Sequence, residues 1–324
     1  MDQHLSQCIL SSKKAIAISI HTFSLSFLSL LIFGCQKDYS DFEVIQTEST
    51  YDVLAIEYFN NQIIATAGSP WEGSDLITSF NLSDWQTKYL TNRGMFDIQV
   101  RNQLLRFVGN SGFILEGREE YQKIDFDRTD MLRACTNIGD NFIAAGGKDF
   151  NKGWAFTLNV DNELTAESYF DAELSDIVCH GSGICIISGY GLILISNDAG
   201  QSWQRSTQSG DFYKGIANNQ YGDTYVVGYS GSILRSVDDG KTWINLKDGH
   251  SPLKINRPFR KIKFYNAQGF IVGDNGTILR SEDDGLSWSD ISIDEDIDLF
   301  DLVLLDNQLV IGGESGKIII VKLR

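Results

Sequence analysis

A short motif that occurs three times constrains this fold more than any other feature of the sequence. It reads GSILRSVDDGKTW from Gly231 to Trp243, GTILRSEDDGLSW from Gly276 to Trp288 and, less closely, GLILISNDAGQSW from Gly191 to Trp203. Each copy is a short apolar run, then a turn rich in Asp, Asn and Gly, then a Trp. An Asp side chain can accept hydrogen bonds from backbone N–H groups of such a turn, and Gly tolerates positive φ. The motif therefore predicts one β-hairpin, used three times, in which the Trp opens the second strand.

The same residues resemble the Asp-box, or BNR repeat, S-x-D-x-G-x-[ST]-W, of sialidase-type β-propellers. The three copies place it at Ser196, Asp198, Gly200, Ser202, Trp203; at Ser236, Asp238, Gly240, Thr242, Trp243; and at Ser281, Asp283, Gly285, Ser287, Trp288. The preceding G-x-[ILV]-[IL]-x-S run is most similar to the photosystem II assembly- and stability-factor-like propellers. This resemblance implies a propeller whose Asp-boxes are structural, and a role in holding other proteins during assembly.

Glycines that open the third strand of each repeat recur about every 40 residues. They stand at Gly73, Gly112, Gly153, Gly191, Gly231, Gly276 and Gly316. A repeat of this length with four strands is typical of a propeller blade. We therefore predict an all-β, seven-bladed β-propeller of four-stranded antiparallel blades over residues 42–324. Only one strand can follow Gly316, so Phe42–Ser49 is predicted to close the ring as the fourth strand of the last blade.

Residues 1–34 are predicted to be a lipoprotein signal peptide. Lys13 and Lys14 precede the apolar segment Ala15–Gly34, and Cys35 follows it. The ending LIFGC resembles a bacterial lipobox, which implies lipid on Cys35, and the acidic segment behind it resembles the surface-export signal of Bacteroidota lipoproteins. Residues 35–41 would then be a lipidated tether that holds an exported protein at the outer membrane, in the periplasm or on the cell surface. An uncleaved membrane anchor is the alternative, because a segment of 20 residues can just span a bilayer.

The net charge of −16 argues against nucleic-acid binding, since an acidic body repels phosphate. The sequence also has no Gly-rich phosphate loop, no Gly-x-Ser-x-Gly elbow and no His cluster with metal-ligand spacing. We accordingly expect no cofactor, no metal and no catalysis. The expected protein is a monomeric, membrane-anchored binding or scaffold propeller for a protein or glycan partner. The alternative is a carbohydrate-active enzyme, sialidase-like or another glycosidase, with its active site on the top face.

A ring of charged residues is the candidate binding site on that top face. Each blade begins with a residue pair whose second member is charged, and in six of seven pairs the first member is apolar or aromatic. The charged members are Asp52, Asp97, Arg133, Asp176, Lys214, Arg260 and Asp301. They would surround the mouth of the central channel and polarise a ligand; the alternative is a rim of weak salt bridges between blades. The longest top loop, Lys247–Asn256, adds His250 and Lys254, with Arg257 nearby.

Cys179 and Cys185 flank Gly181-Ser182-Gly183 symmetrically, so a tight hairpin would set them opposite each other. In an exported protein this spacing permits a disulfide. Two small buried residues beside the channel are the alternative. A metal site from Cys179, His180 and Cys185 is disfavoured, because adjacent strand residues face opposite sides of a sheet.

Overall fold

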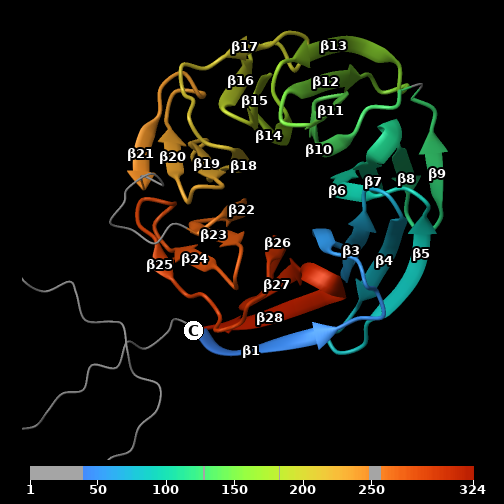
Figure 1. The fold of residues 1–324 in the computed structure, drawn as a ribbon, viewed down its shortest axis with the longest axis vertical. Helices are drawn as coiled ribbons and strands as arrows, with labels where there is room; N and C mark the ends of the chain where they lie inside the picture. Colours follow the sequence, from blue (N-terminus) through green and yellow to red (C-terminus); the bar gives the residue numbers. More distant parts are fainter. Residues whose placement is uncertain (1–38, 127, 182, 248–256) are drawn as a thin grey trace, which may run out of the picture. The chain divides into compact units, whose positions relative to one another are not determined.

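Seven four-stranded antiparallel sheets form the protein and are arranged around a common axis (Figure 1). The computed structural model describes residues 39–126, 128–181, 183–247 and 257–324. In blades 1 to 6 the chain starts at the innermost strand and proceeds outward through adjacent strands. The all-β, seven-bladed architecture predicted from the glycine spacing is thereby confirmed.

The strands of the first three blades are mostly long. They are β2 (Val53–Phe59), β3 (Gln62–Ser69), β4 (Gly73–Ser79) and β5 (Gln86–Thr91) in blade 1; β6 (Met95–Arg101), β7 (Leu104–Gly109), β8 (Ile114–Gly117) and β9 (Tyr121–Ile124) in blade 2; and β10 (Leu132–Ile138), β11 (Asn141–Lys148), β12 (Lys152–Leu158) and β13 (Leu164–Phe170) in blade 3. A one-turn 3₁₀ helix, η1 (Asn110–Gly112), precedes β8.

The three blades that carry complete Asp-boxes have short outer strands. They contain β14 (Leu174–His180), β15 (Ile184–Gly189), β16 (Leu192–Ser196) and β17 (Gln204–Arg205) in blade 4; β18 (Tyr213–Asn218), β19 (Thr224–Gly228), β20 (Ile233–Ser236) and β21 (Ile244–Lys247) in blade 5; and β22 (Phe259–Tyr265), β23 (Gln268–Gly273), β24 (Ile278–Ser281) and β25 (Ser289–Asp290) in blade 6.

Blade 7 joins the two ends of the described chain. Its inner strands are β26 (Leu299–Leu305), β27 (Gln308–Gly313) and, after η2 (Glu314–Gly316), β28 (Lys317–Leu323). Its outermost strand is β1 (Tyr39–Gln46), which pairs antiparallel with β28 so that Val44 faces Ile319. The predicted closure is confirmed, and the strand begins three residues earlier and ends three residues earlier than Phe42–Ser49. Closure covers the edge of β28 that an open array would expose.

The hydrophobic core lies between the blades. Seven clusters of buried side chains each combine residues from two neighbouring blades, one cluster for each interface around the ring. The cluster between blades 7 and 1, for example, packs Ile318 and Ile320 against Ile56 and Ile63. Burial of apolar surface therefore stabilises every interface of the ring, including the one that β1 completes.

Each Asp-box is a turn closed by its own side chains. In blade 5, Ser236 Oγ donates to Asp238 Oδ1 (2.9 Å) and accepts from the N–H of Gly240 (2.8 Å). The two oxygens of Asp238 accept from the N–H (2.8 Å) and hydroxyl (2.6 Å) of Thr242. The boxes of blades 4 and 6 repeat these bonds. Their polar groups are thus satisfied internally, as in a structural turn.

Blade 1 contains a shortened form of this turn. Ser79 takes the place of the box Ser and Asn81 that of the box Asp. Ser83-Asp84-Trp85 forms the last part of the turn. Asn81 Oδ1 accepts from the N–H of Asp84 (2.9 Å), and Trp85 Nε1 donates to the carbonyl of Leu82 (3.0 Å). In the complete boxes of blades 5 and 6, the Trp makes the same bond to the carbonyl of the box Gly.

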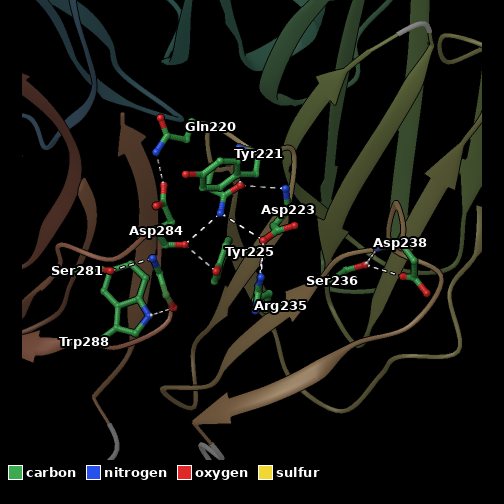
Figure 2. A network of polar contacts seen from close by, with 12 residues as sticks. Gln220, Tyr221, Asp223, Tyr225, Arg235, Ser236, Asp238, Ser281, Asp284 and Trp288 are labelled. Carbon is green, nitrogen blue, oxygen red and sulfur yellow. Dashed lines mark hydrogen bonds and ion pairs between the residues drawn. The ribbon is translucent and has the colours of Figure 1, made fainter. Parts of the chain in front are cut away.

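The box turns also bind the neighbouring blade. In Figure 2, Gln220 and Tyr225 of blade 5 point toward Asp284 in the box of blade 6. Tyr225 Oη donates to the carbonyl of Asp284 (2.7 Å), and Gln220 Nε2 donates to its carboxylate (2.8 Å). Between blades 3 and 4, Thr157 Oγ1 donates in the same way to the carbonyl of Gly200 (2.8 Å). The boxes therefore connect blades on the face of the ring where the third-to-fourth turns lie.

Candidate functional site

The opposite face, which we call the top face, carries the second-to-third turns and the loops that lead into each innermost strand. The two kinds of segment are hydrogen-bonded to each other: Tyr190 donates its N–H to the carbonyl of Glu173 (2.8 Å), and Tyr229 to that of Phe212 (2.9 Å). No Asp-box bond reaches this face among the described residues, so its side chains are available to form a site.

Every innermost strand begins with a β-bulge, and this bulge sets the position of the site residues. The pairing register shifts between the first and third residues of β2, β6, β10, β14, β18, β22 and β26. The middle residue of each bulge is half-buried, whereas the preceding residue is buried in all seven strands. The middle residues, which we call the mouth ring, are Leu54, Phe96, Arg133, Ser175, Lys214, Arg260 and Phe300. The residues that follow them, the inner ring, are Ala55, Asp97, Ala134, Asp176, Gly215, Lys261 and Asp301.

The seven predicted site residues fall into three places. Arg133, Lys214 and Arg260 belong to the mouth ring, and Asp97, Asp176 and Asp301 to the inner ring. Asp52 lies in neither ring, and its carboxylate accepts the N–H of Ser315 in blade 7 (3.0 Å). Six of the seven residues therefore lie in two layers and not in one ring. The second member of each predicted pair is the middle residue of the bulge in blades 3, 5 and 6, but the residue after it in blades 2, 4 and 7.

The inner-ring aspartates bind the next blade around the ring. Asp97 Oδ2 accepts the N–H of Cys135 (2.8 Å), Asp176 Oδ2 that of Ile216 (3.2 Å), and Asp301 Oδ2 that of Ile56 (3.0 Å). In each case the inner-ring residue of the blade that donates the N–H is small, namely Ala134, Gly215 or Ala55. All three carboxylates are buried. They act as links between blades and are covered from solvent.

Two half-buried lysines of β22 pair with these aspartates, and neither is among the residues predicted from the sequence. Lys261 Nζ lies 2.9 Å from Asp176 Oδ2, and this ion pair connects blade 6 with blade 4. Lys263 Nζ lies 2.8 Å from Asp301 Oδ1 and donates to the carbonyl of Ile56 (3.3 Å). Burial alone would lower the pKa of both lysines, but the neighbouring aspartates raise it above the ordinary value. The alternation FRKIKFY, with charges two apart in a strand that is otherwise largely apolar, was the available signal.

Asp97 is the inner-ring carboxyl that no lysine of the described ranges contacts directly. Its burial raises its pKa to about 6; the Lys261 ammonium opposes this effect, and Asp176 and Asp301 add to it. The group therefore changes charge close to neutral pH inside the protein.

The three cations of the mouth ring differ in their partners. Arg133 Nη2 lies 3.0 Å from Glu173 Oε1, and Arg260 pairs with both Asp274 and Asp298 while stacking on Phe300 (4.8 Å to the ring centroid). Lys214 forms no ion pair with a described residue; its Nζ lies 4.1 Å from the centroid of the Phe212 ring. Burial, and then the charges of Arg133 and Arg260, lower the pKa of Lys214 to about 8.

Three aromatic rings lie beside Lys214 on the top face. Phe150, Tyr190 and Phe212 are mutually in contact, with centroids 5.2 Å (Phe150–Tyr190), 5.2 Å (Tyr190–Phe212) and 5.8 Å (Phe150–Phe212) apart. They come from turns and loops of blades 3 to 5, and about half of Phe150 (56%) and Tyr190 (47%) is exposed. We call these three residues the aromatic patch. Aromatic residues in glycine-flanked top turns, such as Gly189-Tyr190-Gly191, were the signal that sequence reasoning passed over.

The remaining candidates are placed as follows. Cys179 and Cys185 face each other on β14 and β15 with Cα atoms 4.1 Å apart, and their sulfurs are bonded. His180 lies 3.6 Å from Asp239 of the neighbouring Asp-box. In the described part of the chain no group of three or more His, Cys, Asp or Glu side chains could hold a metal ion.

Several predictions fall outside the described residues. Cys35 with its lipid belongs to this group, as do His250 and Lys254 of the long top loop. Arg257, just past that loop, is described and donates from Nη1 to Ser292 Oγ (3.3 Å). Within the described ranges, no helix is long and apolar enough to cross a membrane.

Blades 5 and 6 match a known protein family in sequence. Residues 211–298 match the family model of the photosynthesis system II assembly factor YCF48. The matched segment runs from the loop before β18 to the loop before β26 and so contains both blades, including Lys214 and Arg260. The resemblance predicted from the Asp-boxes is confirmed for this segment.

Solved propellers match nearly the whole chain in structure. YCF48 bound to D1 peptide is 14% identical with a TM-score of 0.66, over 89% of this chain and 96% of that one. Virginiamycin B lyase from Staphylococcus aureus is 10% identical with a TM-score of 0.70 (88% and 100%), and the WD40 propeller domain of Doa1 is 13% identical with a TM-score of 0.68 (89% and 97%). No curated protein matches the sequence. At such identities the similarity establishes the fold and leaves function to the site.

Proposed function

We propose that this protein is a non-catalytic binding propeller that holds a protein partner on its top face, and that lipid on Cys35 keeps it at a membrane. The observation that carries the proposal is the aromatic patch beside the Lys214 ammonium. Exposed, mutually packed aromatic rings next to a cation are typical of the centre of a protein interface. The match of blades 5 and 6 to YCF48, together with the solved complex of YCF48 with a D1 peptide, supports a peptide segment as the bound element.

The environment of the inner-ring aspartates favours a binding protein over a glycoside hydrolase. A glycosidase needs two carboxyl groups about 5–9 Å apart that reach the substrate. Asp97, Asp176 and Asp301 are buried and accept backbone N–H groups of the next blade. Their hydrogen-bonding capacity serves the ring, so we assign them no catalytic role. Because virginiamycin B lyase shares the fold, turnover is tested together with binding.

The test is capture of partners from an outer-membrane extract by the full-length lipidated chain, followed by measurement of affinity for the captured protein. Phe150→Ser combined with Tyr190→Ser should weaken binding at least tenfold, since truncation of aromatic interface centres typically costs more than about 1.4 kcal/mol. Tyr221→Ser is the matched control, because Tyr221 is also exposed (74%) but lies in the first-to-second turn of blade 5, on the opposite face. Equal loss in both variants would contradict the proposed face.

Two further arms test the anchor and the chemistry. Cys35→Ser should move the protein from the membrane fraction to the soluble fraction and remove metabolic labelling by fatty acid. A panel of glycans and glycosides should show no turnover. Hydrolysis that is lost on Asp176→Asn would replace the binding proposal with the enzymatic alternative.

A further inference from the structure

The mouth ring has two chemically distinct arcs. Phe300, Leu54 and Phe96 come from the consecutive blades 7, 1 and 2 and form an apolar arc. The other arc, from blades 3 to 6, is polar and consists of Arg133, Ser175, Lys214 and Arg260. All seven residues are half-buried and retain exposed surface, although the Oγ atom of Ser175 is itself buried. A ring divided in this way matches a ligand that is itself apolar on one side and charged on the other.

In the described structure two groups of the polar arc lack an anionic or hydrogen-bonding partner. Lys214 forms no ion pair there but contacts the Phe212 ring, whereas the other two cations of the arc, Arg133 and Arg260, each have carboxylate partners. Ser175 precedes Lys214 in the ring by one blade, and its Oγ is buried without a hydrogen-bond partner. A buried hydroxyl and a poorly solvated ammonium both gain from an added anionic acceptor. The charged groups near Lys214 are Arg133, Glu173, Asp176, Arg260 and Asp274.

We infer that the mouth ring binds a carboxylate carried on an apolar body, with the carboxylate at Lys214 and Ser175 and the apolar body against Phe300, Leu54 and Phe96. The ligand is a small hydrophobic acid or the carboxyl end of a peptide with an apolar last residue. The inference goes beyond the proposed function, because the ring can be occupied whether or not the aromatic patch holds a protein.

The affinity for the carboxylate should depend on pH through the charge of Lys214. In the protein without ligand the pKa of Lys214 is about 8. A bound carboxylate would raise this pKa, because a nearby negative charge favours the charged ammonium. Binding therefore takes up a proton above pH 8, and affinity falls as the pH rises through this range. A bound carboxylate that contacted Arg133 or Arg260 alone would show no such change, because guanidinium stays charged.

The experiment is calorimetric titration of the full-length protein in lipid nanodiscs with 4-phenylbutyrate, against 4-phenylbutyramide as the neutral analogue and empty nanodiscs as the blank. The acid should bind and the amide should bind at least tenfold more weakly. Affinity for the acid should fall at least tenfold between pH 7 and pH 9.5. A Leu-terminated pentapeptide, compared with its amide, shows which of the two sources of carboxylate fits better.

Variants separate the named contacts from general effects. Lys214→Met should abolish binding, whereas Lys214→Arg should retain it and remove the fall between pH 7 and pH 9.5. Phe96→Ala should weaken binding about tenfold and leave the pH dependence intact. Lys152→Met, at an exposed position of blade 3, is the matched control and should change nothing. Equal binding of acid and amide, or full affinity in a folded Lys214→Met protein, would overturn the inference.

Discussion

At the scale of single residues, Asp97 shows how the closely packed axis controls charge. Its carboxyl is fully buried, accepts the N–H of Cys135 and has no lysine in direct contact. Asp176 and Asp301 occupy equivalent positions but each has an ammonium within 3 Å. The same residue type on three blades therefore meets two electrostatic environments.

Asp97 should make stability fall as the pH rises from about 4 to about 6. Its pKa is 3.8 when exposed and about 6 in the folded protein, so over this range the folded state holds a proton that the unfolded state has released. The fully ionised group costs about 3 kcal/mol. Asp97→Asn keeps an acceptor for Cys135 and should raise the free energy of unfolding at pH 7 by about 2–3 kcal/mol.

The measurement is denaturant unfolding of both proteins from pH 4 to pH 8. The difference between wild type and Asp97→Asn should open between pH 4 and pH 6 and stay constant above. Asp296→Asn, at an exposed position, serves as the control and should give a curve parallel to wild type. A constant difference across the whole range would show that Asp97 is not the titrating group.

Residue positions at the axis were predictable in part. The sequence located all seven innermost strands and selected Arg133, Lys214 and Arg260, which do lie in one ring. It could not separate them from Asp97, Asp176 and Asp301, since a bulge adds one residue without a change in composition. Lys261 and Lys263 were missed because their partners come from other blades, at distances along the chain that no local pattern reports.

At the scale of the element, the Asp-box hairpin is the unit whose structure follows most directly from its sequence. Its Ser, Asp and Gly are joined by bonds over at most four residues, so a local pattern carries nearly all the geometry. What the pattern could not show is that the box Gly also faces the previous blade. An ideal Cβ on Gly285 would lie 2.6 Å from the ring of Tyr225.

Gly285→Ala should therefore cost more than the backbone strain alone. Gly222 provides the comparison, because its φ of +87° nearly equals the +89° of Gly285 and nothing lies within 4 Å of its Cβ position. Gly222→Ala should destabilise the protein by about 1–2 kcal/mol through positive φ. Gly285→Ala should add about 1–3 kcal/mol of overpacking against Tyr225. Thermal unfolding of the two variants measures the difference. Equal midpoints would mean that the box turn shifts away from Tyr225 without loss of stability.

At the scale of the whole molecule, periodic glycines predicted the number of blades, and the shortage of strands after Gly316 predicted the closure. Both follow from counting, because each blade needs four strands. The aromatic patch did not follow, since it joins side chains of three blades whose loops share no motif. Closure by β1 depends on side chains that face the last interface: Ile45 packs against the cluster of blades 7 and 1, while Val44 is partly exposed (38%).

Ile45→Asp should open the ring locally. A carboxylate placed against Ile318 and Ile320 loses apolar burial and is poorly solvated, so we expect a loss of about 3 kcal/mol and a thermal midpoint lower by about 5–10 °C. Amide hydrogen exchange should accelerate in β1 and β28 and stay unchanged in blade 4. Val44→Asp, one residue away on the opposite face of β1 and at an exposed position, should lower the midpoint by less than about 2 °C. Exchange that accelerates equally in all blades would point to global loss of stability.

The pairing of β1 with β28 also fixes an order of events during biosynthesis. The ribosome makes β1 before any blade and makes its partner β28 last among the described strands. Gln46 and its pairing partner Lys317 are 271 positions apart in the chain, so β1 waits unpaired while six blades assemble. A chain that stops before β28 leaves this strand without a partner. The propeller thus becomes complete only after β28 has been made, and a copy truncated before β28 exposes the edge of β1.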